Sequence, residues 1–301
     1  MEFDSEMLVC FTGPKGTSDY RAIELFDSIG KYEPLPMPSV TEVIQTVNNT
    51  PGCYGILPME NSTDGEMTTI LDRLIFGSTN VRIQGEVVLA EGIACFGLTG
   101  QEVFTSVISH PMVLDLSSRF IKERGLTTRH ALSTSDACRT VVVERDPTLV
   151  ALAPPEVGEM FDLTMYASQV SDVNEIRTRY VLIGQEITAP TGRDKTSLIV
   201  TPSADTVGSL AKVAQIFSDA EVNMVSILSR PLQAKLGMHS FSITCEGHIL
   251  EEPVSHAVAS LLASGTSVKV LGSYPKWKGV EVTTPFDSLP LGSLEPNSIA
   301  I

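Results

Sequence analysis

The chain has 301 residues, of which 43% are hydrophobic and 19% are charged, and its formal net charge is −15 at pH 7. This composition is typical of a folded protein with room for two domains, and it excludes an intrinsically disordered chain. The acidic charge disfavours binding to nucleic acid or to acidic membrane surfaces. No apolar run approaches the length of a membrane span, and the acidic start, Met1–Glu6, is unlike a secretory signal, so we expect a cytoplasmic protein.

The cysteines indicate free thiols. There are five of them, at positions 10, 53, 95, 138 and 245. Their number is odd, they are scattered along the chain, and no two are spaced as a CxxC pair. We therefore expect reduced cysteines and no metal site.

The first part of the chain predicts alternating strands and helices. The predicted strands are Leu8–Thr12, Tyr54–Leu57, about Arg82–Ala94, Val107–Ser109, Val150–Leu152, Thr164–Ala167 and Tyr180–Ile183. The predicted helices are Asp19–Ile29, one opened by a capping box at Ser39–Glu42, Glu66–Phe76, one from Pro111 to about Glu123, and one from Ser135 to Glu144. Such alternation favours an α/β domain with mainly parallel sheets, which we place at residues 7–185.

The pattern changes after a linker at residues 186–194 that contains proline and glycine. The predicted strands are then Thr196–Thr201, Met224–Ser229, Met238–Cys245 and Ser267–Gly272, and the predicted helices are about Val207–Ala220 and Glu252–Ala263. The order βαββαβ predicts an α+β ferredoxin-like module over residues 195–275. Residues 276–301 are rich in proline, serine and glycine, and we expect a loose tail.

Two polar segments follow strands of the first domain, where open α/β sheets carry ligands. The backbone amides of Gly13–Thr17 could hold an anion, although glycine and proline at a strand–helix junction also simply form a turn. Pro58–Gly65 is a dense polar loop that suits either a ligand or the cap of the next helix.

Two further segments carry groups suited to chemistry. Ser109–Pro111 contains a Ser-His pair, but adjacent residues do not set a hydroxyl against an imidazole, so a helix cap is the simpler interpretation. In Arg177–Tyr180 two arginines flank a hydroxyl, which suits a substrate with carboxylates; the alternative is an edge strand with exposed arginines.

In this order the four segments resemble the prephenate dehydratase family. The matching residues are Gly13, Pro14, Gly16 and Thr17; Pro58, Glu60, Asn61, Ser62, Gly65 and Asp72; Ser109, His110 and Pro111; and Thr178 and Arg179, followed by Tyr180 where the family has phenylalanine. The C-terminal module resembles an ACT domain, an amino-acid-sensing unit, at Lys195–Leu198, Ser229–Pro231 and Gly272–Pro275.

The resemblance implies a two-lobed catalytic domain, similar to periplasmic binding proteins, followed by an ACT regulatory domain. It implies conversion of prephenate to phenylpyruvate with loss of carbon dioxide and water, in phenylalanine biosynthesis. It also implies phenylalanine as an effector and a homo-oligomer that forms through the ACT domains. The reaction needs no metal or organic cofactor.

The resemblance also implies roles for individual residues. Thr178 is the catalytic residue and donates a hydrogen bond to the departing hydroxyl, and Arg179 faces the same cleft and binds a substrate carboxylate. The other substrate-binding residues are Thr17, Asn61, Ser62 and Ser109. The effector-binding residues are Gly208, Leu210, Asn223, Ser229 and Arg230.

Departures from the family pattern leave alternatives open. Ser18 stands where the family has phenylalanine, and Leu116 stands where it has glutamine. These changes also suit a prephenate decarboxylase, which keeps the hydroxyl and gives a non-aromatic dihydro-hydroxyphenylpyruvate for secondary metabolism, whereas Thr178 favours dehydration. Arogenate is an alternative substrate, and a non-catalytic amino-acid sensor is an alternative of another class.

The C-terminal module departs from the pattern as well. Val207 and Ser209 alter the turn that opens its first helix, and Leu228 replaces the glutamate that precedes Ser229 in the family motif. We therefore expect weak feedback by phenylalanine.

Overall fold

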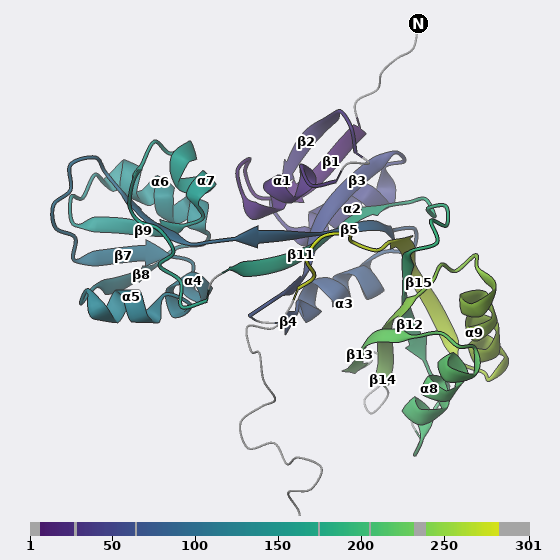
Figure 1. Cartoon of the computed structure of the whole chain (residues 1–301). Coiled ribbons are helices and arrows are strands. Elements are labelled where there is room, and N and C mark those ends of the chain that lie inside the picture. The colour runs from purple at the N-terminus through teal and green to yellow at the C-terminus, as the bar shows by residue number, and fades with distance from the viewer. Residues whose placement is uncertain are drawn as a thin grey trace, which may run out of the picture.

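The computed structural model describes residues 7–26, 29–63, 65–173, 175–204, 206–231 and 239–282. It contains three sheets, one in each lobe of a two-lobed body and one in a C-terminal module (Figure 1). The chain leaves the first lobe along β5, Arg82–Glu91, and returns from the second lobe along β11, Ile176–Gly184. Two crossings of this kind make the two-lobed α/β body that the sequence predicted.

The first lobe contains a mixed sheet of order β2-β1-β3-β11-β5, with β4 paired to β3. Its other strands are β1 Met7–Thr12, β2 Tyr32–Met37, β3 Cys53–Asn61 and β4 Gly65–Glu66, and its helices are α1 Ser18–Ile23, α2 Val40–Asn49 and α3 Thr68–Gly77. β1 runs parallel to β2 and β3, whereas β11 is antiparallel to β3 and β5. The prediction of mainly parallel sheets is therefore wrong here, because β11 must run back against the strand that left the lobe.

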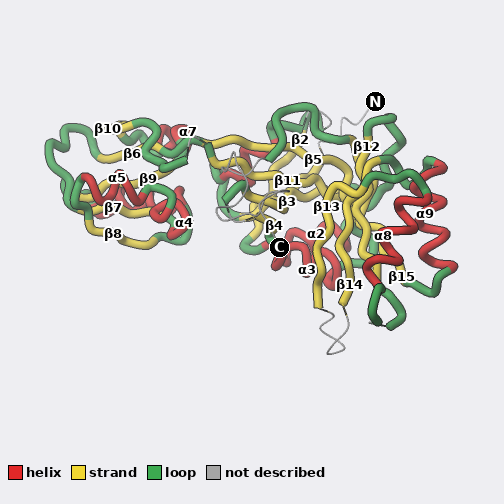
Figure 2. The backbone as a smooth tube through the Cα atoms, turned by 60° about the horizontal axis from the view of Figure 1, so that its bottom comes forward, coloured by secondary structure: helices red, strands yellow, loops and turns green. Residues whose placement is uncertain are grey.

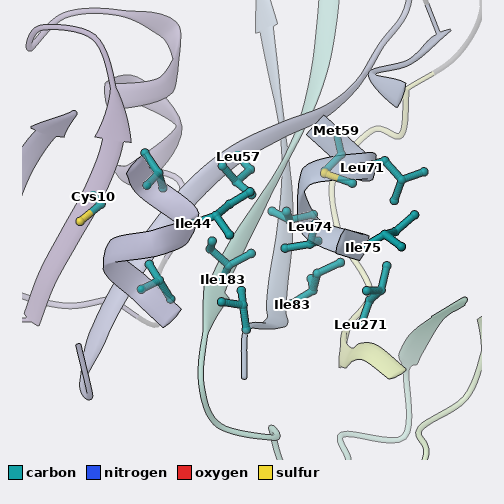
Figure 3. Close-up of a cluster of buried hydrophobic side chains, with 14 of the residues drawn as sticks. Cys10, Ile44, Leu57, Met59, Leu71, Leu74, Ile75, Ile83, Ile183 and Leu271 are labelled. Carbon is teal, nitrogen blue, oxygen red and sulfur yellow. The ribbon is translucent and has the colours of Figure 1, made fainter. Parts of the chain in front are cut away.

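Buried apolar side chains fill both faces of this sheet. On one face, side chains of α2 and α3 pack on strand residues that include Leu57, Ile83 and Ile183 (Figure 3). Leu271 of the C-terminal module belongs to the same cluster, so this core continues across the junction between the two units. On the other face, Ile23 of α1 packs with residues of β1, β5 and β11.

The second lobe has a sheet of order β10-β6-β9-β7-β8. Its strands are β6 Ala94–Gly97, β7 Ser106–Ser109, β8 Thr127–His130, β9 Leu149–Ala153 and β10 Thr164–Ala167, and its helices are α4 Pro111–Asp115, α5 Ser118–Glu123, α6 Thr134–Glu144 and α7 Pro155–Met160. The single helix predicted after Pro111 is interrupted because the Leu116 carbonyl accepts hydrogen bonds from Asp172 and Ser171. Ser133, rather than Ser135, caps α6.

The C-terminal module has the predicted order βαββαβ. Its elements are β12 Asp194–Thr201, α8 Ser209–Asp219, β13 Met224–Pro231, β14 His239–Glu246, α9 Glu252–Ala263 and β15 Ser267–Pro275. They form an antiparallel sheet of order β13-β14-β12-β15 whose outer face is covered by α8 and α9 (Figure 2). Met238, predicted to open the third strand of this module, lies outside the described residues.

The start of the predicted loose tail differs from the expectation. The Lys276 backbone N–H donates to the Arg193 carbonyl at 2.8 Å, and Trp277 packs against the apolar cluster of the first lobe that contains Ile23. Residues 283–301, the rest of that predicted tail, lie outside the described residues. In the part of the chain that is described, no helix is both long and apolar enough to cross a membrane.

The backbones of the two units lie very close together at Gly272. A Cβ atom at this position of β15 would lie 2.3 Å from the carbonyl oxygen and 2.6 Å from the nitrogen of Ile83 in β5. Both are backbone atoms that no side-chain rotation can move, so only glycine allows this approach. The close packing of β15 on β5 therefore requires a residue without a side chain at position 272.

Gly272→Ala should separate β15 from β5 and destabilise the protein by about 1–3 kcal/mol, the usual cost of overpacking a tight contact. Gly77→Ala is the matched control, because nothing lies within 4 Å of the added Cβ at this last residue of α3. Urea unfolding of both variants measures the difference. Equal stability of the two variants would show that β15 and β5 can move apart at Gly272 without a loss of stability.

Candidate active site

A pair of buried polar side chains lies where the two lobes meet. Thr178 of β11 is paired with Asn61 of β3 in the strand register, and the Asn61 amide Nδ2 donates to Thr178 Oγ1 at 2.9 Å. Asn61 Oδ1 accepts from Thr63, at 2.9 Å for the backbone N–H and 2.5 Å for the hydroxyl, which fixes the orientation of the amide. Because Thr178 Oγ1 accepts this hydrogen bond, its own proton can be donated to another acceptor.

The position of this pair follows from its neighbours. Thr178 is 6% exposed and Asn61 is 2% exposed, so both hydroxyl and amide are shielded from solvent. The Thr63 hydroxyl lies 3.8 Å from Met112 Sδ at the start of α4 in the second lobe. The Asn61–Thr178 pair is therefore buried in the first lobe, and Asn61 is only two residues from Thr63, which contacts the second lobe.

Arg179 does not face the same side as Thr178, so that expectation is wrong. Successive residues of a strand point to opposite faces. Arg179 is opposite Glu60 in the register, and its Nε donates to Glu60 Oε2 at 2.9 Å. Its Nη1 lies 3.7 Å from Glu86 Oε2, on the face that meets the C-terminal module. Its guanidinium therefore takes part in an internal ion-pair cluster.

Thr17 holds the turn between β1 and α1. Its hydroxyl accepts from the Tyr20 backbone N–H at 3.4 Å, as an N-cap, and donates to the Pro14 carbonyl at 3.1 Å. The turn requires left-handed backbone at Gly13 and Gly16, with φ of 91° and 88°. A Cβ at Gly16 would lie 2.0 Å from Met160 Sδ of α7, so the loop contacts the second lobe directly.

The two predicted serines make structural hydrogen bonds. Ser62 Oγ accepts from the Arg177 backbone N–H at 3.0 Å and thus fixes the backbone next to Thr178. Ser109 is fully buried in the second lobe, and its hydroxyl donates to the Leu152 carbonyl at 2.6 Å. His110 accepts from the Met112 N–H as the cap of α4, in agreement with the simpler interpretation of that Ser-His pair.

Sequence reasoning missed an arginine on the Thr178 face. Glu91 ends β5 and lies two residues from Leu89, which is opposite Thr178, so Glu91 shares the face of Thr178. Arg21 of α1 forms an ion pair with Glu91, and its Nη2 lies 2.9 Å from Glu156 Oε1 of α7 in the second lobe. Arg21 is four residues after Thr17, a spacing that places both on one side of a helix and could have indicated it.

The same face carries a carboxyl group that titrates near neutrality. Burial raises the pKa of Asp19 to about 7, although hydrogen bonds from the Thr12 backbone and the Tyr180 side chain favour its ionised form. Burial also raises the pKa of the Glu91 carboxyl, while Arg21 and Ser18 counteract that rise. Asp19 is therefore able to exchange a proton at neutral pH.

The two departures from the family pattern have different surroundings. The Ser18 hydroxyl donates to Glu91 Oε1 at 3.0 Å, so the position of the expected aromatic ring is part of a polar network. The Leu116 side chain packs against the apolar core of the second lobe. Ser18 therefore alters the polar surface around the candidate site, while Leu116 contributes to packing.

The predicted effector residues are not all on one face of the module. Ser229 and Arg230 are successive residues of β13, Ser229 exposed and Arg230 half-buried. Arg230 forms a two-point ion pair with Asp72 of α3 in the first lobe. Its Nε donates to Asp72 Oδ1 at 3.0 Å, and its Nη2 donates to Asp72 Oδ2. The Asn223 amide donates to Glu246 at 3.2 Å.

The remaining predicted effector residues lie at the start of α8. Gly208 is its left-handed N-cap, with φ of 84°, and Leu210 is 43% exposed.

Several known proteins similar to this chain are prephenate dehydratases. The family model for prephenate dehydratase matches residues 9–188. A prephenate dehydratase of Methanocaldococcus jannaschii is 30% identical over 271 residues, which cover 89% of this chain and 97% of that protein. A bifunctional chorismate mutase/prephenate dehydratase of Aquifex aeolicus is 29% identical over 281 residues, 92% of this chain and 75% of that protein.

A solved structure extends the likeness to the fold. Prephenate dehydratase from Arthrobacter aurescens, in complex with L-Phe, superposes with a TM-score of 0.81 at 24% identity and covers 89% of this chain and 90% of that one. The family match spans more than half of the chain and includes Asn61 and Thr178. The chain belongs to the prephenate dehydratase family.

Proposed function

We propose that this protein is a prephenate dehydratase, which converts prephenate to phenylpyruvate in phenylalanine biosynthesis. The observation that supports this most directly is the hydrogen bond from Asn61 to Thr178, in a chain of this family. It leaves the Thr178 hydroxyl as a buried donor at the junction of the lobes. A donor of this kind is what the dehydration step needs and what decarboxylation alone does not.

The proposed reaction needs little from the protein besides positioning and one donor. The bond between the ring and its carboxyl group breaks and releases carbon dioxide, its electron pair moves into the ring, and the bond to the ring hydroxyl breaks. To leave as water the hydroxyl must take up a proton, which comes ultimately from solvent, while a hydrogen bond stabilises the negative charge that develops on its oxygen. Thr178 supplies that hydrogen bond, and its burial away from solvent strengthens the interaction.

Arg21, rather than Arg179, is the cation that we place against a substrate carboxylate. Its side chain lies on the Thr178 face, and it already binds the carboxylates of Glu91 and Glu156. A substrate carboxylate could replace Glu156, whose side chain is 54% exposed, without leaving the buried Glu91 unpaired. Arginine suits this exchange because its guanidinium can bind two carboxylates at once.

Thr178→Val keeps the shape of the side chain and removes the donor, so turnover of prephenate should fall on the order of a hundredfold or more. Thr128→Val, the same change at an exposed position of β8, is the control and should be neutral. Products are separated by chromatography and identified by mass spectrometry near neutral pH, against a no-enzyme sample, because prephenate becomes aromatic spontaneously in acid.

The product decides between the two reactions that the sequence leaves open. Phenylpyruvate from the wild-type protein, lost in Thr178→Val, supports dehydration. A non-aromatic dihydro-hydroxyphenylpyruvate would instead identify a decarboxylase, and the polar network at Ser18 would then be the feature that distinguishes this chain. No turnover of prephenate or arogenate would favour the non-catalytic sensor.

Arg21→Met should raise the KM for prephenate by about tenfold to a hundredfold, the usual effect of losing a charge-assisted hydrogen bond. Arg139→Met is the control, because Arg139 pairs with Asp136 on the surface of the second lobe. Steady-state kinetics of both variants provides the measurement. A KM that rises in Arg179→Met but not in Arg21→Met would show that Arg179, and not Arg21, binds the substrate carboxylate.

We also propose that residues 195–275 form an ACT regulatory domain that binds phenylalanine. The Arthrobacter aurescens protein, whose structure contains L-Phe, supports this by its similar fold. In the present chain the Arg230 guanidinium is engaged by Asp72, and Leu228 packs against the core of the first lobe. Arg230 is therefore not free for the carboxylate of an amino acid, and Leu228 has no charge to offer its ammonium group.

Binding of phenylalanine should consequently be weak, and Asp72→Asn should strengthen it by releasing Arg230. Isothermal titration of the wild-type protein and the variant with L-phenylalanine measures both affinities. Asp115→Asn, at the end of α4 in the second lobe, is the charge-matched control. Tight binding to the wild-type protein with strong inhibition would show that Arg230 and Leu228 do not limit the site.

A further inference from the structure

A buried ion-pair cluster joins the C-terminal module to the strand that carries Thr178. Its centre is Glu86 of β5, whose side chain is 1% exposed. Glu86 Oε1 accepts from Lys195 Nζ at 2.8 Å and from the Trp277 backbone N–H at 3.1 Å. Glu86 Oε2 makes no hydrogen bond to any described residue and faces Arg179 Nη1 at 3.7 Å. Glu86 therefore contacts both sides of the junction.

The charges of this cluster depend on one another. Lys195 opens β12 of the C-terminal module with Asp194, and its side chain is 9% exposed. A carboxylate and an ammonium at this depth are strongly disfavoured unless they are paired, so removal of either group leaves a buried unpaired charge. The position of the module is thus tied to that of β5 through Glu86 and Lys195.

Arg179 links this cluster to the candidate catalytic pair. Its guanidinium lies between Glu86 and Glu60, and its backbone adjoins that of Thr178. In the strand register, Arg179 is opposite Glu60 where Thr178 is opposite Asn61. The two pairs occupy opposite faces of the same two strands, so a shift of one pair moves the backbone that positions the other.

We propose that Glu86 is a positioning residue, which together with Lys195 holds Arg179 and thereby fixes Thr178 against Asn61. This inference rests on the function proposed above. The cluster borders a pocket of about 160 Å³ that is also lined by Val225 and Ser226 of β13. The cluster therefore gives the C-terminal module a charged connection to Thr178, in addition to the apolar contact of Leu228 of β13 with the core of the first lobe.

The test compares Glu86→Gln, Lys195→Met and the double variant with the wild-type protein. Glu144→Gln is the control, since Glu144 pairs with Arg129 through two hydrogen bonds of 2.7 Å on the surface of the second lobe. Turnover of prephenate by the wild-type protein is measured first, and this result alone decides the proposed function. kcat, KM and the unfolding temperature are then determined for each variant.

Each single variant should lower kcat on the order of tenfold and change KM by less than about twofold, because the donor is misplaced while binding groups remain. The double variant should be no slower than the slower single variant, since both changes break one connection. An unchanged kcat with a lower unfolding temperature would overturn the proposal. It would also be overturned if the fold-changes in kcat of the two single variants multiplied in the double variant, because the two residues would then act independently.

Hydrogen exchange provides a readout that does not require turnover. In Lys195→Met, peptides covering residues 58–63 and 176–182 should exchange faster than in the wild-type protein, although Lys195 lies in another module. The same peptides in Glu144→Gln should be unchanged. Lys195→Met carries this test alone if Glu86→Gln does not fold, and unchanged exchange in folded Lys195→Met would overturn the proposal.

Discussion

The pairing of β11 between β3 and β5 decides which polar groups of this protein can meet. One register places Thr178 against Asn61 and Arg179 against Glu60. Strand alternation then sends the first pair toward α1 and the second lobe and the second pair toward the C-terminal module. Two adjacent residues of one short motif therefore serve opposite faces, one with a buried hydroxyl and the other with a half-buried cation.

Most of the positive charge near these sites is neutralised internally. Arg21 pairs with Glu91 and Glu156, Arg179 with Glu60, and Arg230 with Asp72. In a chain with a net charge of −15, a dianionic substrate meets a repulsive field at long range. In the binding mode that we propose, a substrate carboxylate replaces an exposed protein carboxylate at short range, and Glu156 is suited to that exchange.

The contacts between the units have distinct physical characters. The contacts between the lobes include the Arg21–Glu156 ion pair and the approach of the Gly16 backbone to the half-exposed Met160 side chain, and these can separate without exposing a large apolar core. The C-terminal module instead shares an apolar cluster with the first lobe and adds buried charge at Glu86 and Lys195. We expect the second lobe to move more easily than the C-terminal module, because fewer buried groups resist its opening.

The sequence by itself determined the element order, the βαββαβ module and the family, because hydrophobic periodicity and short motifs are local properties of a chain. It also indicated Asn61 and Thr178, but not that they touch, since 117 residues separate them. Sheet register and strand alternation, which depend on distant segments, turned Arg179 away from Thr178 and placed Arg21 on its face. Charge pairing between modules was likewise beyond the sequence: Glu86 and Lys195 lie in unremarkable strands, and only folding brings them together in a place that excludes water.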